Sequence, residues 1–200
     1  MQKNRVHYHH GNLRQALLSA ALELLDDAGV EGVTIRAVAR RAGVAHSAPA
    51  NHFRDRRALL TCLAAGIFSE LAAEIQQSLT SKRLTGPARV RRFADVLLAF
   101  GLRHPHRYRL LWRRDLLDDS DAALQAPMDL IYDSLVKELE ACDSTHPESP
   151  HTQAVALWSL MHGYVSMRLD GNLRAKKDEL TGRARERAII DVLLRGIYSS

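Results

Sequence analysis

The side chains best suited to chemistry in this sequence follow a glycine in the N-terminal third of the chain. Residues 45–52, AHSAPANH, present small and polar groups with almost no apolar face. Hydroxyl, imidazole and amide groups can hydrogen-bond base edges in the DNA major groove, and a small apolar group can meet a thymine methyl. We therefore predict that residues 34–53 form a helix-turn-helix whose second helix enters that groove.

Two short helical patterns must position those groups. Thr34 can cap a helix that runs to about Arg41, and the apolar residues of that stretch recur at helical spacing toward a core. Gly43 interrupts the pattern before a second helix over about 46–52. Pro49 fits the first turn of that helix, where the backbone N–H that proline lacks has no partner to lose.

Longer helical patterns lie on either side of the turn. Asn12 can cap the preceding helix and Gly29 can close it, while Asp55 can cap a long helix that follows. Breaks punctuate the rest of the chain at Gly86-Pro87, His104-Pro105, 117–120, 142–150 and Asp170-Gly171. Because no alternating strand pattern and no internal repeat occurs, we predict an all-α chain, with a three-helix N-terminal domain over 9–68 and a larger helical body over 69–200.

The last predicted helix, over about 183–198, is apolar on all sides in its C-terminal half. A helix on the surface of a globular protein keeps one polar face. We therefore expect this helix to be buried, either in the core or against a second subunit.

Composition and charge agree with a globular protein that binds a polyanion. The 200 residues are 46% hydrophobic and 26% charged, and the net charge is +5. The first sixty residues carry +4 of that charge, from nine basic and five acidic side chains. The polar N-terminus lacks a signal-peptide pattern and no apolar run approaches ~20 residues, so we expect a cytoplasmic protein with no membrane contact.

Metal and catalytic patterns are weak. His7, His9 and His10 could hold a metal, but a polar arm that touches DNA is the favoured interpretation. Cys62 and Cys142 lie inside apolar helical patterns and form no motif, so we expect reduced core residues. An enzyme would need acid, base or metal-ligating groups that converge, and we find none, so we expect no catalytic residue, no metal and no cofactor.

At this point the sequence resembles a known family. From His9 to Phe68 it is similar to the N-terminal domain of TetR/AcrR-type bacterial transcriptional regulators, through HHGNLRQALLSAALELLDDAGVEGVTIRAVARRAGVAHSAPANHFRDRRALL. The run LWSLMHG over 157–163 resembles the Trp/His/Gly signature of the WHG class of TetR regulatory domains. The resemblance implies a homodimer, a palindromic double-stranded DNA operator and an unknown small-molecule effector, with 69–200 as the ligand-binding and dimerisation domain.

The family pattern also implies DNA contacts. It puts Thr34 against a phosphate and Arg36 at a guanine edge, which the two-pronged donor set of arginine fits. The other implied positions are His46, Ser47 and Ala48 toward the bases and His52 and Arg56 toward the phosphates, contacts that set register.

One position departs from the family pattern. Ala50 stands where the family commonly has a tyrosine that meets the DNA backbone. We expect its loss either to weaken nonspecific affinity for DNA or to shift the contact to Asn51 and the arginines at 54, 56 and 57. The alternative for these three arginines is a solvated charged face.

The WHG-like run has two interpretations. Trp158 and His162, one turn apart, would either line an effector pocket or pack at an interhelical contact, with Gly163 permitting a close approach. Packing is favoured, because a motif shared by regulators with diverse ligands suits architecture. The full set of candidate effector residues is Phe100, Tyr108, Trp112, Met128, Tyr132, Trp158, Met161 and His162.

These expectations describe a non-enzymatic, ligand-responsive repressor that binds a palindromic operator as a homodimer. Two copies are needed because two recognition helices must meet major-groove faces about 34–36 Å apart. The alternative is a helical small-molecule-binding or catalytic bundle without sequence-specific DNA binding. A protein that binds DNA without sequence preference is disfavoured, because the basic charge is confined to one end of the chain.

Overall fold

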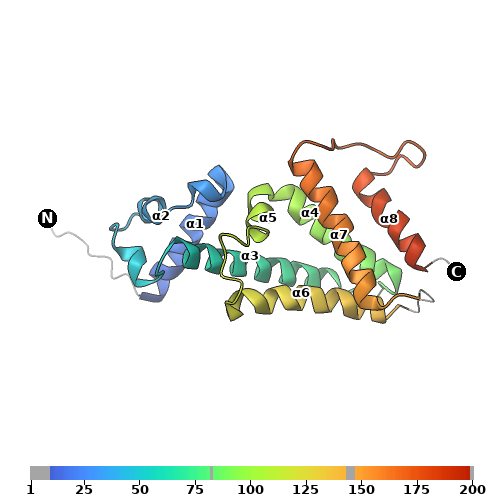
Figure 1. Cartoon of the computed structure of the whole chain (residues 1–200), viewed down its shortest axis with the longest axis horizontal. Helices are drawn as coiled ribbons and strands as arrows, with labels where there is room; N and C mark the ends of the chain where they lie inside the picture. The colour runs from blue at the N-terminus through green and yellow to red at the C-terminus, as the bar shows by residue number, and fades with distance from the viewer. Residues whose placement is uncertain (1–9, 82, 143–146, 199–200) are drawn as a thin grey trace. The chain divides into compact units, whose positions relative to one another are not determined.

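The computed structural model describes residues 10–81, 83–142 and 147–198, and side chains from residue 13 onward. This part of the chain is helical apart from an isolated β-bridge between Lys177 and Ala184, which confirms the predicted all-α class (Figure 1). The elements in chain order are α1 His10–Gly32, α2 Ile35–Arg41, the 3-10 helix η1 Ala48–Asn51, α3 Arg56–Ser78, α4 Pro87–Arg103, α5 Pro105–Leu111, α6 Ala122–Glu140, α7 Pro150–Leu169 and α8 Arg185–Tyr198.

The chain divides into two compact units. The first contains the residues up to Ile67 together with His106–Gln125, and the second contains Phe68–Pro105 and the residues from Ala126 on. Residues 106–125 thus group with the N-terminal elements, so the first unit is discontinuous in sequence. The bounds of the predicted domains, 9–68 and 69–200, differ from those of the two units, and the domains stay a prediction.

The turn chemistry of the helix-turn-helix is as predicted. The hydroxyl of Thr34 accepts the Ala37 N–H at 3.1 Å and so caps α2. Gly43 has φ 68°, a left-handed conformation that glycine adopts without steric cost. The Val44 N–H then returns to the Ala39 carbonyl at 3.0 Å, which closes the end of α2.

The second element of the motif differs from the prediction. Instead of a helix over 46–52, residues 46–47 form a turn and Ala48–Asn51 form a single 3-10 turn. The Ala50 N–H bonds to Ser47 and the His52 N–H bonds to Pro49, each three residues back. Pro49 lies at the start of η1 as expected, and it supplies no N–H for a longer α-helical ladder.

Gly29 bends α1 near its end, where the sequence predicted a stop. Its φ of 70° and ψ of −175° fall in a region that is essentially restricted to glycine. A Cβ at this position would also lie 3.1 Å from Nδ1 of His106, in the same unit. Two independent constraints therefore require glycine here. The start of α1 also differs from the prediction, because the helix begins at His10 rather than at Asn12.

The long helix α3 begins where the sequence predicted, since Asp55 accepts the Ala58 N–H at 2.7 Å. By length and composition alone α3 could cross a membrane, although the sequence led us to expect no apolar run of that length. Its apolar side chains are buried, however, including Leu59, Leu60 and Ile67 at 2% exposure or less. A core helix of a globular unit has the same composition.

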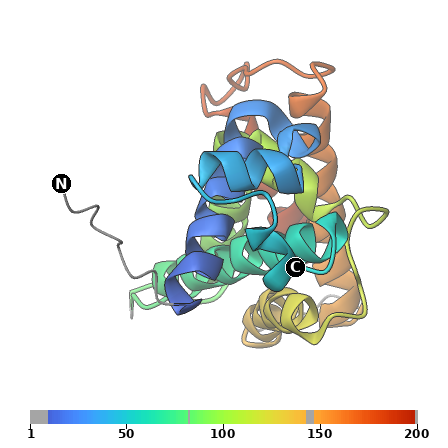
Figure 2. The same cartoon turned by 90° about the vertical axis from the view of Figure 1, so that its left-hand side faces the viewer.

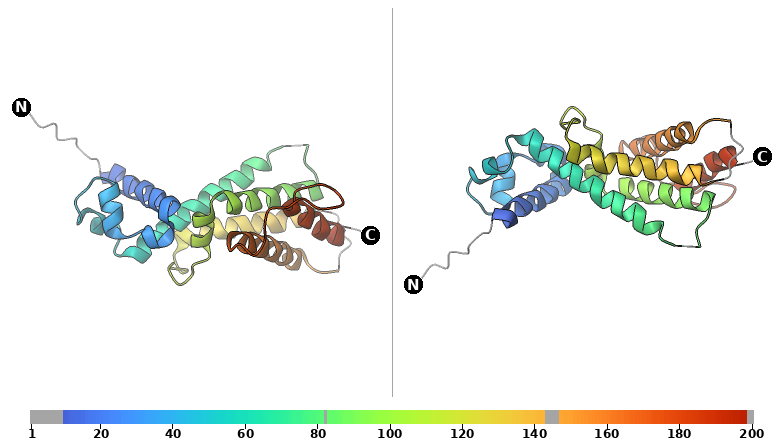
Figure 3. Two further views of the ribbon diagram at one scale, coloured as in Figure 1. Left: turned by 90° about the horizontal axis from the view of Figure 1, so that it is seen from above. Right: turned by 90° about the horizontal axis from the view of Figure 1, so that it is seen from below.

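In the second unit, α4 packs against α7 and α8, and polar bonds tie α6 to its neighbours (Figure 3). Gln76 donates to Ser134 at 3.0 Å, and Arg89 forms a two-pronged ion pair with Glu138. The last helix, α8, is buried on one face only, through Ile190, Leu194 and Ile197. The expected all-round burial is therefore not met within this chain, since Val192 is 64% exposed.

Replacement of Gly29 tests the double constraint at the bend of α1. Gly29→Ala should lower the free energy of unfolding by about 1–3 kcal/mol, because alanine is strained in this backbone region. Gly66→Ala is the matched control, since a Cβ there would meet nothing within 4 Å inside α3 and alanine favours a helix by ~0.5–1 kcal/mol. Urea unfolding of both variants measures the difference. An unchanged Gly29→Ala midpoint would contradict the assignment.

Candidate nucleic-acid interface

The polar side chains after Gly43 are presented on an anchored segment. His46, Ser47 and Asn51 are exposed, whereas Pro49 is buried. Phe53 is also buried, and the guanidinium of Arg14 lies 5.4 Å from the centre of its ring. The apolar anchors hold η1 against the first unit, and the polar groups are left available to a partner. Figure 2 shows α2 and the segment that follows it.

The remaining predicted DNA contacts differ in exposure. Thr34 and Arg36 are exposed, while Ala48 and His52 are half-buried. Thr34 already accepts the Ala37 N–H through its hydroxyl, which leaves its other lone pair and its proton for a phosphate oxygen. The predicted base and backbone contacts are thus presented together on α2, η1 and the turn between them, but their contacts with DNA stay a prediction.

The three arginines of α2 have different partners. Arg41 donates to Glu23 at 3.1 Å and to Asp27 at 2.9 Å, and these hydrogen bonds, chiefly the one to Asp27, raise the pKa of Arg41. Arg36 and Arg40 lie one turn apart on the exposed side, and within the described residues neither side chain forms an ion pair. The unpaired positive charge of α2 therefore lies along one side of the helix. Sequence reasoning missed Arg40, although the i, i+4 spacing from Arg36 was available.

The structure gives Arg56 partners within the protein. Its Nε donates to the Val33 carbonyl at 2.7 Å and its Nη2 to the Val30 carbonyl at 2.6 Å. Glu31 lies 3.8 Å away. These carbonyls belong to the last turn of α1 and to the turn before α2, and the Val30 carbonyl also accepts the Val33 N–H at 3.1 Å. The arginine is thus explained without DNA, and its predicted phosphate contact remains a prediction.

The neighbouring arginines bond to the segment after α5, in the same unit. Arg57 donates to the Leu117 carbonyl, and Arg54 lies 3.4 Å from Asp118. The backbone N–H of Asp118 donates in turn to the hydroxyl of buried Thr61 at 3.0 Å. This arrangement favours a structural role for Arg57, whereas Arg54, whose side chain is 70% exposed, fits the solvated charged face.

A second tie joins α5 to α1. Arg107 forms a two-pronged ion pair with Asp26, at 2.9 and 2.6 Å, and its side chain is only 19% exposed. His106 packs against Gly29 in the same region. Because α5 follows α4 after a single residue, the chain leads directly from α4 to the helix that positions the motif.

The eight predicted effector residues divide between the two units. Tyr108 and Trp112 belong to the first unit, with ring centres 6.0 Å apart, and burial raises the pKa of Tyr108. None of the eight lines the groove between α7 and α8 or the cleft beside the start of α8. The effector role of these residues stays a prediction. The six in the second unit are Phe100, Met128, Tyr132, Trp158, Met161 and His162.

Both interpretations of the WHG-like run remain open. Met161 is fully buried, Trp158 and His162 are half-buried, and burial lowers the pKa of His162. A Cβ on Gly163 would meet no atom within 4 Å. The close helix approach that was expected at Gly163 is therefore not made within the described chain.

The residues that the structure describes do not form a metal-binding cluster, and their two cysteines are free thiols. Among the described residues, no group of three His, Cys, Asp or Glu side chains could hold a metal. His7 and His9 lie outside the described residues, and so does the side chain of His10. Cys142 is buried as predicted, while Cys62 is half-buried and accepts a hydrogen bond from Arg14 at 3.1 Å.

Comparisons with known proteins match both parts of the chain. Residues 17–62 match the family described as "Bacterial regulatory proteins, tetR family". Residues 90–191, half of the chain, match "Tetracyclin repressor-like, C-terminal domain".

Curated relatives are similar over the N-terminal part. The chain is 51% identical over 51 residues to the tetracycline repressor protein class C of Escherichia coli, a match that covers 26% of this chain and 23% of that protein. It is 34% identical over 68 residues to the regulator BetI of Pectobacterium carotovorum, covering 34% and 35%. The match thus spans about a quarter to a third of these relatives.

Solved structures are similar over nearly the whole chain. A Rhodococcus protein of unknown function has a TM-score of 0.78 and 28% identity, with 96% of this chain and 98% of that chain covered. NalD of Pseudomonas aeruginosa, a repressor of a multidrug efflux pump, has a TM-score of 0.59 and 21% identity, covering 95% and 98%. The latter likeness concerns the fold alone.

The carbonyl contacts of Arg56 predict a loss of stability on its removal. Arg56→Gln should lower the free energy of unfolding by about 1–3 kcal/mol, because two carbonyls lose a charged donor. The control Arg54→Gln should change it by less than ~0.5 kcal/mol, since Arg54 is 70% exposed and its ion pairs are at 3.4 Å. Urea unfolding measures both values. Equal stability of the two variants would show that the Arg56 contacts do not hold the turn.

Proposed function

This chain belongs to the TetR family of bacterial regulatory proteins, and on that premise we propose that it is a transcriptional repressor that binds a palindromic operator as a homodimer. The observation that carries the proposal is the combination of an anchored, polar η1 segment with the unpaired arginines of α2. His46 and Ser47 offer groups that can read bases, Asn51 offers an amide for the DNA backbone, and Arg36 and Arg40 supply positive charge beside them. A regulator of this kind meets its DNA in the cytoplasm.

The exposed apolar face of the last two helices supports dimerisation. Val155 and Met167 of α7 are 54% and 45% exposed, and Val192 of α8 is 64% exposed. A groove of about 300 Å³ runs between these helices, lined in part by Ala156, Val192, Leu193 and Gly196. Val192 is both exposed and part of the lining of this groove, and exposed apolar side chains of this kind mark an interaction site. A second copy of this face would cover them and bring two recognition segments onto one DNA duplex.

Open space beside two glycines fits the same partner. A Cβ on Gly163 of α7 or on Gly196 of α8 would meet nothing within 4 Å in this chain. Helices can approach closely where such residues face one another. The close approach expected at Gly163 would then be made with the second subunit.

An effector would act through the second unit. The candidate residues remain Phe100, Tyr108, Trp112, Met128, Tyr132, Trp158, Met161 and His162. A ligand shifts the occupancy of the operator only if it binds one conformation better than the other. The direct step from α4 to α5, and the Arg107–Asp26 pair that ties α5 to α1, offer a route from a ligand to the DNA-binding motif.

The matches name regulators and repressors rather than enzymes, which disfavours the catalytic alternative. A ligand-binding bundle without DNA recognition would not require unpaired arginines next to exposed base-reading groups. Selection of tight binders from a random DNA pool separates the two functions. We expect an inverted repeat to be recovered, and recovery of no common sequence would contradict the proposal.

Arg36 is predicted to read a base. Arg36→Ala should cost about 1–3 kcal/mol on the selected site and relax preference at one base pair in each half-site. Arg41→Ala is the control, because Glu23 and Asp27 already neutralise Arg41. Fluorescence anisotropy with selected and random DNA measures both effects. Equal losses on the two DNAs would show that Arg36 contacts only phosphate.

The dimer face predicts a change of oligomeric state. Val192→Asp should give monomers with weak operator binding, because a carboxylate would be buried without a partner. Leu130→Asp in α6 is the matched control, since Leu130 is 50% exposed and does not line the groove between α7 and α8. Sedimentation velocity measures the mass of each. A dimeric Val192→Asp variant would place the interface elsewhere.

A further inference from the structure

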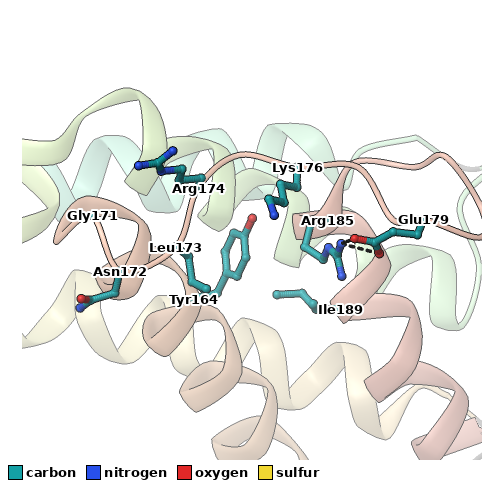
Figure 4. A pocket seen from close by; sticks show the side chains of 9 residues that line it. All are labelled: Tyr164, Gly171, Asn172, Leu173, Arg174, Lys176, Glu179, Arg185 and Ile189. Carbon is teal, nitrogen blue, oxygen red and sulfur yellow. Dashed lines mark hydrogen bonds and ion pairs between the residues drawn. The ribbon is translucent and has the colours of Figure 1, made fainter.

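Besides the groove between α7 and α8, the second unit has a cleft beside the start of α8. It has a volume of about 580 Å³, within the range of small-molecule sites (~300–1,000 Å³). Its wall is built by the end of α7, the segment between α7 and α8, and the first turns of α8 (Figure 4). None of the predicted effector or DNA-contacting residues lines it.

The segment over this cleft is held in a defined conformation. Lys177 and Ala184 form a β-bridge, and the Arg185 N–H donates to the Lys176 carbonyl at 3.0 Å. Asp178 accepts the backbone and hydroxyl of Thr181, each at 2.8 Å, and these bonds lower the pKa of Asp178. The backbone that carries the lining is therefore ordered before any ligand arrives, which reduces the entropy lost on binding.

Positive charge dominates the lining. Arg185 is paired with Glu179 through two contacts of 2.6 Å and also donates to the Lys177 carbonyl at 3.1 Å. The side chains of Arg174 and Lys176 form no hydrogen bond or ion pair with any residue that the structure describes. Figure 4 shows the Lys176 ammonium directed toward the space between Tyr164 and Arg185. The unbalanced charge of the cleft is therefore that of Arg174 and Lys176.

Apolar groups lie next to these charges. Tyr164, Leu173 and Ile189 contribute carbon surface to the lining. The phenol of Tyr164 is already held, since it donates to Glu186 at 3.3 Å and accepts from Arg168 at 3.1 Å. A ligand that suits this lining carries one anionic group beside an apolar body.

We propose that this cleft binds a small amphipathic anion, with its carboxylate or equivalent group on Lys176 and its apolar body against Tyr164, Leu173 and Ile189. The ammonium of Lys176 donates charge-assisted hydrogen bonds to the anionic group, and Arg174 adds to the local positive potential. The assignment goes beyond the proposed repressor function and does not depend on it, because binding is measured on the chain without DNA.

Calorimetric titration of the full chain with octanoate, kept below its micellar concentration, tests the site. Octanoate should bind saturably, whereas octanol, which lacks the charge, and acetate, which lacks the chain, should bind at least about tenfold more weakly. Lys176→Gln should weaken octanoate binding at least about tenfold, because the charge-assisted donor is lost.

The neighbouring lysine provides the matched control. Lys177 is exposed and does not line the cleft, so Lys177→Gln should bind octanoate like the wild type. Both lysines are exposed, and circular dichroism with thermal unfolding verifies that both variants keep the fold. Wild-type affinity of Lys176→Gln, equal loss in both variants, binding of octanol as tight as that of octanoate, or no saturable octanoate binding would each overturn the proposal.

Discussion

The contact on which the DNA-binding motif depends is the pair of hydrogen bonds from Arg56 to the carbonyls of Val30 and Val33. Arg56 opens α3, while the two carbonyls lie between the bend of α1 and the cap of α2, so one side chain connects three helices. A cation in the first turn of a helix opposes the helix dipole by about 0.3–1 kcal/mol. The two carbonyl acceptors offset that cost, and they fix the place from which Thr34 starts α2.

The direction of α2 decides which charges meet a partner. Arg41 donates to Glu23 and Asp27 on α1 and is neutralised there, whereas Arg36 and Arg40 are exposed and form no ion pair with any residue that the structure describes. Other arginines of the first unit are also bonded within it. Arg107 forms an ion pair with Asp26, and Arg57 donates to the Leu117 carbonyl. The number of arginines therefore overstates the positive surface available to DNA, because several of them are bonded within the unit.

Local signals in the sequence predicted local structure well. The cap at Thr34, the glycine turn at Gly43 and the start of α3 after Asp55 each involve residues within a few positions of one another. Contacts across the chain could not be anticipated in this way. The carbonyl partners of Arg56 are 23 and 26 residues away, and the grouping of residues 106–125 with the first unit depends on tertiary packing. The 3-10 form of η1 was also missed, because Pro49 is compatible with the start of either type of helix.

Repression of a particular gene requires that this protein distinguish one DNA sequence from others through charge and base contacts together. The most direct test is competition between the DNA upstream of its own gene and a scrambled duplex of equal composition, at two salt concentrations. We expect the upstream DNA to bind at least about a thousandfold more tightly, with both affinities falling as salt rises. Equal affinity for the two duplexes at both salt concentrations would contradict sequence-specific recognition and, with it, the proposed role as a repressor.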